Sequence, residues 1–536
     1  MAIFNRLARD ESGNVAVVFA LALIPLFGAV GALIDYTRVS NLRAEVAAAI
    51  DAGLLAVGSQ PPMSDQQAFD TVNKWLETHI KPTYQGNWKL DSVVQQKGGK
   101  ITATVSGAID TTIAKVLGVQ SIPISVTSEI VSAVGKVEVA MVLDNTGSMA
   151  TKNKIGKLKD AAEALVDTLA KAVLDPSDLK IGLVPFSQTV NVGPNYKDAA
   201  WLDKDGKSDS AKSLFLGQEV NRLDLFKAMG TTWGGCVETR FGYEASETPA
   251  DSAKPNTLYV PFFAPDEPGI AGEGDNGKKN NGTSPPYDYN NSYLDDTPLG
   301  TIKADLATKG LNDALTLPDY RLLEGDILKY AGSPTPYEGT TDSLKYDYGP
   351  NSGCEMAPIM RLTTNTAEAK TAINKMIANG NTDIPIGASW GWNVLSDKGP
   401  FGDGVAYGTE DWTKIMVLMT DGNNENQTGN ELNESIYSGL GYVWQEKMGV
   451  PADNKNKSAR TAARDDKLSE ICTAMKAKGI VIYTVRVETN NGMPSDPVMK
   501  ACATQPDYYY EVNDVSKMVA AFEDIGNSIQ KLRLAR

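Results

Sequence analysis

An unbroken apolar run near the start of the chain is its first clear pattern. Residues 15–34 contain only apolar residues, Gly and one Pro, without a single charge. About twenty such residues, at ~1.5 Å per residue in a helix, cover the ~30 Å hydrocarbon core of a bilayer. A buried core helix rarely extends so far without a polar position, and a cleaved signal peptide normally has a shorter apolar region of ~7–15 residues. We therefore expect a retained transmembrane helix, with positive residues on both sides that give little orientation: Arg6, Arg9, Arg38 and Arg43.

The pattern that follows the apolar run predicts a small α+β unit. Helical patterns are expected over 36–57, which is rich in Ala, and over 65–80. Apolar and polar residues then alternate over 101–109 and 121–134, as in half-buried strands.

From Lys136 onward, mainly apolar runs replace the alternation. Four such runs are expected to be parallel strands that are covered on both faces: 136–143, 179–186, 413–420 and 480–487. Helical periodicity separates several of them, at 155–173, 368–378, 457–478 and 514–531. Alternating strands and helices predict an α/β fold with a doubly wound, mostly parallel sheet, whose ligands bind at the carboxyl ends of the strands. The chain thus divides into an N-terminal segment at 1–36 with the transmembrane helix, the small α+β unit at 37–135 and this domain at 136–536.

Polar side chains follow two of the predicted strands directly. Asp144, Thr146 and Ser148 come just after the first strand of the sheet, where a turn can aim one carboxylate and two hydroxyls at a single point. Asp421 ends the third strand, and Thr382 offers a further hydroxyl. Oxygen donors of this kind suit the hard cations Mg²⁺ and Mn²⁺, with Ca²⁺ less favoured if only six positions are offered.

The alternative interpretation of Asp144 is a turn or helix N-cap residue. The triplet after a buried strand, a matching helix and a second carboxylate at a later strand end are harder to obtain together by chance. Asp383, the neighbour of Thr382, is an alternative ligand in its place.

This set of residues resembles the metal-ion-dependent adhesion site of von Willebrand factor A domains, the family to which integrin inserted domains belong. That family uses an Asp-x-Ser/Thr-x-Ser triplet, a distant Thr and an Asp before Gly, which here are Asp144, Thr146, Ser148, Thr382 and Asp421. The resemblance implies a metal-dependent binding protein, in which a carboxylate from a protein ligand fills the last metal position.

A large insertion, at about 188–362, separates the second strand from the next helix. Residues 241–300 are acidic and rich in Gly, Asn and Pro, which favours irregular, solvated structure over a packed core. For 272–291 we expect a flexible surface loop. The functional alternative for the insertion is a ligand-recognition subdomain beside the metal site, with a small core of its own from five aromatic residues: Trp233, Tyr243, Tyr259, Phe262 and Phe263.

The four cysteines favour an oxidising compartment. None has the short CxxC spacing of a zinc site. Cys236 and Cys354 lie near the two ends of the insertion, and we predict that they pair. A second bridge between Cys472 and Cys502 is plausible, although three connectivities exist and buried thiols are an alternative. Bridges fit a periplasmic or extracellular domain.

Catalysis finds little support in the sequence. Residues 387–391 match the G-x-S-x-G nucleophile elbow, but the single histidine, His79, lies far upstream, whereas hydrolases need it after the serine. We expect Ser389 to be a helix residue. A metal-dependent hydrolase through Asp144 and Asp421 lacks a separate general base, so we expect no enzyme. The formal net charge of −15 also argues against nucleic acid as a partner and favours attraction for cations.

Several segments of the chain carry a further resemblance: ESGNVAVVFALALIPLFGAVGALIDYTRV, LDNTGSM, WGGCVETR, GCEMAPI and YYYEVNDVSKMVAAFEDIGNSIQKLRL. They are similar to segments of pilus assembly proteins of the Tad (Flp, tight-adherence) type, and of their TadG members in particular, and this resemblance covers nearly the whole chain. It implies a pilin-like unit at 37–135 and a single-pass protein of the bacterial inner membrane, with the large domain in the periplasm or exported to the cell surface. Unlike processed pilin-like members, the chain has no Glu shortly after Gly13, which counts against prepilin-type cleavage.

Two functions follow from this resemblance. If the metal site grips other pilus or envelope components, the protein is an assembly or anchoring factor. If it grips a host or abiotic surface, the protein is a pilus adhesin. An intact anchor favours the first function, and release to the pilus surface favours the second.

Overall fold

The structure, a computed structural model, describes residues 12–60, 63–84, 86–96, 100–131, 135–173, 175–269, 291–336, 349–425, 433–487 and 497–534. The chain forms two compact units, each with its own hydrophobic core. The first comprises residues 1–134, 172–175 and 534–536, and the second comprises 135–171 and 176–533. Arg6, Arg9 and residues 272–290 of the predicted flexible loop lie outside the described residues.

The first unit contains the two predicted helices. Helix α2 (Ser12–Gly58) is 47 residues long and includes Pro25, and α3 (Asp65–His79) follows it. The start of α3 is fixed by Ser64 and Gln67, since the Gln67 N–H donates to the Ser64 hydroxyl and the Ser64 N–H donates to the Gln67 side chain, at 3.2 and 3.0 Å.

Three antiparallel strands, in the order β1-β2-β3, complete the first unit. Strands β2 (Lys100–Asp110) and β3 (Ser121–Val131) match the predicted alternation. Strand β1 (Trp88–Gln95) was not predicted, because its register shifts between Leu90 and Ser92 and the regular alternation of buried and exposed positions breaks there.

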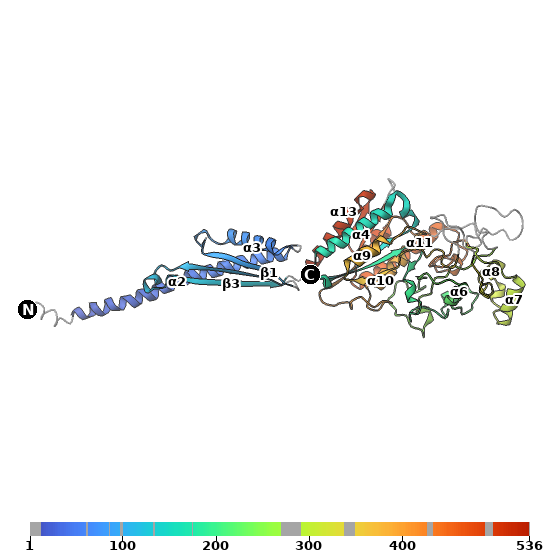
Figure 1. The fold of residues 1–536 in the computed structure, drawn as a ribbon, viewed down its shortest axis with the longest axis horizontal. Helices are drawn as coiled ribbons and strands as arrows, with labels where there is room; N and C mark the ends of the chain where they lie inside the picture. The colour runs from blue at the N-terminus through green and yellow to red at the C-terminus, as the bar shows by residue number, and fades with distance from the viewer. Residues whose placement is uncertain are drawn as a thin grey trace, which may run out of the picture. The chain divides into compact units, whose positions relative to one another are not determined.

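Helix α2 has two halves with different surroundings. In the second half, one face is buried against α3 and the sheet, at 3–4 residue spacing: Val39, Leu42, Val46, Ala49, Ile50, Leu54 and Val57. Figure 1 shows this half lying along the strands. In the first half, large apolar side chains are exposed, including Phe19, Leu26, Phe27 and Leu33. This helix is long and apolar enough to cross a membrane, as the sequence predicts.

The second unit is built on one mixed sheet. Its order is β11-β10-β9-β4-β5-β6-β7, and β8 pairs with β5. The parallel strands are β4 (Lys136–Asp144), β5 (Leu179–Phe186), β9 (Trp412–Thr420), β10 (Val481–Val487) and β11 (Tyr509–Val512). The antiparallel strands are β6 (Val190–Asn191), β7 (Cys236–Val237) and β8 (Met360–Thr363). The path β8-β5-β4-β9-β10-β11 is the doubly wound order 3-2-1-4-5-6, so the predicted α/β fold is confirmed.

Helices cover both faces of this sheet. On one face α4 (Lys154–Lys171) packs with α9 (Thr366–Asn374) and α13 (Met518–Leu534). On the other, α10 (Ile384–Leu395) and α11 (Lys457–Ala477) share a hydrophobic core with alternate side chains of the strands. The short helix α12 (Pro497–Cys502) packs beside α11.

Two glycines allow α10 to lie close to the sheet. A side chain at Gly387 would meet Phe186 at 2.6 Å, and one at Gly391 would meet Val142 at 2.4 Å. The G-x-S-x-G sequence is therefore one turn of a closely packed helix, and Ser389 is a helix residue, as predicted.

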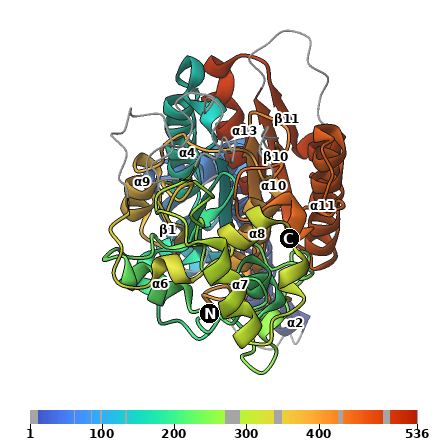
Figure 2. The ribbon, with the colours of Figure 1, turned by 90° about the vertical axis from the view of Figure 1, so that its right-hand side faces the viewer.

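The aromatic residues predicted to form a separate core of the insertion do not do so, because Trp233, Tyr259, Phe262 and Phe263 belong to the core of the sheet. The insertion does contain a small core of its own, which is formed instead by aliphatic residues: Leu216, Ile302, Leu306, Ala314, Leu322 and Leu323. Its helices are α5 (Asp209–Leu214), α6 (Arg222–Ala228), α7 (Leu299–Thr308) and α8 (Asp319–Glu324). Helices α7 and α8 pack together, and α6, α7 and α8 gather at one end of the unit (Figures 1 and 2). Because β6 and β7 extend the main sheet, Trp233, Tyr259 and Phe263 join the cluster that contains Phe186. Tyr243 is not among the buried residues. The expectation of solvated structure is also wrong for 257–268, most of which is buried.

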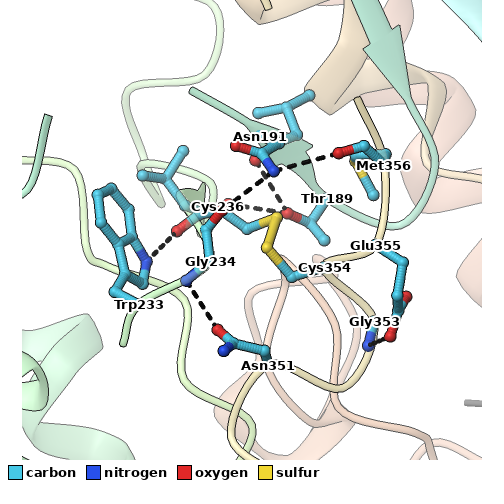
Figure 3. Close-up of a disulfide and its surroundings, with 12 residues drawn as sticks. Thr189, Asn191, Trp233, Gly234, Cys236, Asn351, Gly353, Cys354, Glu355 and Met356 are labelled. Carbon is cyan, nitrogen blue, oxygen red and sulfur yellow. Dashed lines mark hydrogen bonds between the residues drawn. A yellow bond between two sulfur atoms is a disulfide. The ribbon is translucent and has the colours of Figure 1, made fainter. Parts of the chain in front are cut away.

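Both predicted disulfides are present. Cys236 bonds to Cys354, and Cys472 bonds to Cys502. The first joins β7 to the segment that returns from the insertion (Figure 3). Asn191 reinforces this junction, because its amide donates to the carbonyls of Gly234 and Met356, both at 3.1 Å.

Candidate functional site

Neighbouring parallel strands bring two carboxylates to one edge of the sheet. Strands β4 and β9 pair in parallel with Leu143 opposite Met419. Asp144, the last residue of β4, therefore lies beside Thr420, the last residue of β9, which Asp421 follows. This is the carboxyl edge at which doubly wound sheets bind their ligands.

The Asp-x-Thr-x-Ser triplet forms a connected group with Asp421. One oxygen of Asp144 accepts the Thr146 N–H at 2.7 Å, and the other accepts the Thr420 hydroxyl at 2.7 Å. The hydroxyls of Thr146 and Ser148 are 2.9 Å apart, and that of Ser148 donates to Asp421 at 2.6 Å. Four of the five predicted ligands are thus joined in one chain of hydrogen bonds.

Thr382, the fifth predicted ligand, lies on a loop that touches the triplet. The Gly147 N–H donates to the carbonyl of Gly380 at 2.8 Å, and the Asn379 N–H donates to the carbonyl of Asn145 at 2.7 Å. Thr382 itself is buried, and its carbonyl accepts the Glu425 N–H at 2.8 Å. The backbone therefore holds the Thr382 loop between the triplet and the segment after Asp421.

Asp383, the alternative ligand in place of Thr382, is engaged within the chain at one of its two carboxylate oxygens. Its carboxylate caps the start of α10 by accepting the Ile386 N–H at 3.2 Å. The same oxygen lies 3.0 Å from the guanidinium of Arg464, which is also buried. The carboxylate is therefore already paired with a cation of the chain.

Two members of the group were not predicted from the sequence. Thr420 orients Asp144 through the hydrogen bond given above. Lys154, at the start of α4, forms a buried ion pair with Asp421. The only sequence signal for either residue is its place, directly before Asp421 and at the start of the helix that follows the triplet.

The electrostatics of the group favour binding of a cation. Burial raises the pKa of the Asp144 carboxyl to about 6, and the negative charge of Asp421 contributes to the rise. The ammonium of Lys154 balances one of the two carboxylates, which leaves one negative charge uncompensated. Carboxylate and hydroxyl oxygens are the donors that Mg²⁺ and Mn²⁺ prefer, so the residues present fit such an ion. The described residues hold no cluster of three or more His, Cys, Asp or Glu, so the hydroxyls are essential to this fit.

The first disulfide is connected to the site through hydrogen bonds of the residue that follows Cys354. Glu355, next to Cys354, accepts the amide of Asn379 at 2.9 Å and the Gly353 N–H at 3.1 Å, the second of which Figure 3 shows. Asn379 in turn contacts the triplet through Asn145. The bridge therefore anchors the segment that supports the Thr382 loop.

A comparison with protein families matches residues 13–60 to a family described as putative Flp pilus-assembly TadE/G-like. The N-terminal segment is TadE/G-like. The predicted resemblance is confirmed for this segment, which comprises most of α2. A comparison with curated proteins gives no match.

Solved structures of pilus proteins share a partial likeness with this chain. The pilus adhesin SpaC from Lactobacillus rhamnosus GG is 10% identical over 84% of this chain and 35% of its own, with a TM-score of 0.31. The vWF domain of the type V pili tip protein Mfa5 from Porphyromonas gingivalis is 10% identical over 74% of this chain and 95% of its own, with a TM-score of 0.32. The pilus adhesin RrgA from Streptococcus pneumoniae is 11% identical over 84% of this chain and 49% of its own, with a TM-score of 0.32.

Proposed function

We propose that this chain is an envelope-anchored, metal-dependent binding protein that acts in the assembly or adhesion of Flp-type pili. Asp144, Thr146, Ser148, Thr382 and Asp421 hold a divalent cation, Mg²⁺ or Mn²⁺, at the carboxyl edge of the sheet. The cation offers an open coordination position to a carboxylate from a protein partner.

One observation carries this proposal. Two carboxylates and two hydroxyls from separate strands converge, and the charge of the fully buried Asp144 has no cation of the chain in contact with it among the described residues. A buried charge of this kind is costly unless it is paired or coordinates a metal. A bound cation removes that cost and links the site to a partner.

The N-terminal segment supports a role in pilus assembly. It matches a TadE/G-like family, and the exposed apolar half of α2 suits insertion in the inner membrane as a single pass. Two disulfides suit an oxidising compartment, so we place the large unit in the periplasm or at the cell surface. The metal site then binds another envelope or pilus component.

Adhesion to a host or abiotic surface is the second candidate function. It is favoured by the insertion, of which α6, α7 and α8 lie at one end of the unit that carries the site. Binding residues often lie on such additions to a rigid scaffold.

Bacteria that carry Asp421→Asn test both functions together. The substitution removes one charge while it keeps the shape of the side chain. Asp160→Asn, the same change at an exposed position of α4, is the matched control. If pili fail to form, the protein is an assembly factor, and if pili form but attachment is lost, it is an adhesin. Normal pili and normal attachment at equal protein levels would overturn the proposal.

A further inference from the structure

A cavity lined by both polar and apolar side chains lies at the other end of α10 from the metal site. It has a volume of about 250 Å³ and is lined by residues of several loops. Asn393, near the end of α10, is one of them, whereas Asp383 and Thr382 lie just before its start. Ten residues at ~1.5 Å each separate the two ends by about 15 Å, so this cavity is distinct from the metal site.

A buried positive charge stands beside this cavity without a carboxylate partner. Arg240 is 7% exposed, and its guanidinium donates to three carbonyls, those of Thr248, Thr257 and Ser246, at 2.7 to 3.2 Å. Within the part of the chain that the structure describes, no carboxylate forms an ion pair with it. The exposed Lys398 at the cavity is likewise without an ion pair among the described residues.

The only acidic side chain of the cavity is already engaged. Glu247 accepts hydrogen bonds from the hydroxyls of Ser396 and Tyr407, and its other oxygen lies 3.3 Å from the ammonium of Lys478. The charge of Glu247 is thus balanced by Lys478. The excess charge at the cavity is positive, which favours an anionic ligand.

Aromatic and polar side chains complete the wall. Trp201 is half-buried and supplies a ring edge-on to that of Tyr259, at 5.7 Å between centroids. The Tyr259 hydroxyl and the Asn393 amide nitrogen are buried. The Asn393 side chain lies beside that hydroxyl, but neither atom has a hydrogen-bond partner of normal geometry among the described residues. Such groups are costly to leave unpaired, and hydroxyls of a ligand would satisfy them after a small side-chain movement.

We propose that this cavity binds a small polyhydroxylated carboxylate, with a uronic acid unit of an acidic polysaccharide as the simplest example. Arg240 and Lys398 attract the carboxylate, Trp201 contacts the ring, and Tyr259 and Asn393 bond the hydroxyls. The volume is below the ~300–1,000 Å³ of typical pockets for larger ligands, so it suits a single sugar unit.

Titration calorimetry with the full chain tests this proposal, in a detergent without a sugar head group. Glucuronate and galacturonate should bind at one saturable site, while glucose and galactose bind at least tenfold more weakly. Lys398→Glu should weaken acid binding about fivefold or more, and Lys227→Glu, the same change on the exposed side of α6, should leave it unchanged. Ala200→Trp, which places a large ring at the exposed edge of the cavity, should abolish binding.

The result must also be independent of the metal site. Acid binding that persists in EDTA and in Asp421→Asn supports the cavity even if the metal proposal fails. Loss of binding in EDTA, equal affinity for neutral sugars, full binding by Ala200→Trp, or no saturable binding of the acids at millimolar concentration would overturn the proposal. Binding of an oligogalacturonate but of neither single acid would show that the ligand is a longer chain, and would overturn the single-unit site.

Discussion

Glu238 and Asp144 are both fully buried carboxylates of the second unit, but their pKa values are shifted in opposite directions by the residues around them. Glu238 contacts Arg222 at one oxygen and Lys447, at 2.7 Å, at the other. Burial alone would raise the pKa of Glu238, but the two cations outweigh it and the pKa is lowered. Around Asp144 the order is reversed, because burial and the charge of Asp421 raise its pKa to about 6.

The difference separates a structural ion network from the proposed binding site. Glu238 gains all of its compensation from within the chain, so nothing further is needed to stabilise its charge. Asp144 accepts hydrogen bonds from the Thr146 N–H, the Thr420 hydroxyl and the Asp421 N–H, all of them neutral donors, and no cation of the described residues pairs with it. We therefore propose that a cation from outside the chain compensates its charge. Carboxylates whose pKa is raised by burial and a like charge are candidates for function for this reason.

The largest expected effect comes from breaking the Glu238 network. Glu238→Gln leaves the buried Arg222 and Lys447 without a carboxylate, and should reduce the free energy of unfolding by about 3–5 kcal/mol. Chemical denaturation of the full chain measures this loss. Glu129→Gln, which breaks an exposed pair with Lys100, serves as the control and should cause no measurable loss. Equal effects of the two substitutions would show that the buried network contributes no more to the free energy of unfolding than an exposed ion pair.

The second effect is the stabilisation that a metal provides at Asp144 and Asp421. Mg²⁺ or Mn²⁺ at a hundred times its dissociation constant should add about 2.7 kcal/mol to the free energy of unfolding. Thermal melts with metal and with EDTA measure this difference within each variant. It should vanish in Asp421→Asn and persist in Asp160→Asn. Because Asp421→Asn also removes the charge partner of Lys154, its melting temperature in EDTA should fall below that of the unaltered chain. A metal effect retained in Asp421→Asn would contradict the assignment.

Glu324 is a third buried carboxylate. Unlike Glu238, it has no cation in contact with it among the described residues. Burial, with the charge of Glu267, raises the pKa of Glu324 from 4.5 to about 8. An acid with a raised pKa keeps its proton in the fold, so stability should fall as the pH rises from 4.5 to 8. Glu324→Gln keeps an acceptor for Asn433, which donates at 2.9 Å, and carries no charge.

Denaturation of the chain with Glu324→Gln at pH 5 and at pH 8.5 measures the contribution of this proton. At pH 5 the variant and the unaltered chain should be equally stable. At pH 8.5 the variant should be more stable by at least about 1 kcal/mol. The same difference at both values would show that the carboxyl does not titrate in this interval.

The smallest effect concerns Lys154, which pairs with Asp421 beside the proposed metal. Lys154→Met makes the group more negative by one charge, so Mn²⁺ affinity should rise about three- to tenfold. The control is Lys157→Met on the same helix, where the lysine pairs with Asp160 at the surface. Competition with a fluorescent chelator gives the affinities. A weaker affinity in Lys154→Met would show that Lys154 positions Asp421 for the metal and does not oppose it.

The sheet and much of the site follow from local sequence patterns. Continuous apolar runs mark β4, β5, β9 and β10, because strands covered on both faces have no polar side. The triplet that begins at Asp144 is recognisable because its members are nearly consecutive and follow such a strand.

Features that depend on distant residues were not predictable from local patterns. Gly387 and Gly391 have a packing role only because Phe186 and Val142 lie opposite them. The ion pair of Asp383 with Arg464 joins residues 81 positions apart, so no local pattern around Asp383 indicates it. Residues 257–268 lie within a largely polar stretch of sequence. They are nevertheless buried, because β6 and β7 continue the main sheet beside them.

Direct titration of the full chain with Mn²⁺, with the free ion followed by electron paramagnetic resonance, tests the central claim most directly. One Mn²⁺ should bind per chain, and Ser148→Ala, which removes a single hydroxyl, and Asp421→Asn should each lose that binding while Asp160→Asn retains it. No bound Mn²⁺ in the unaltered chain, or equal binding by all of these variants, would contradict a metal site at Asp144 and Asp421.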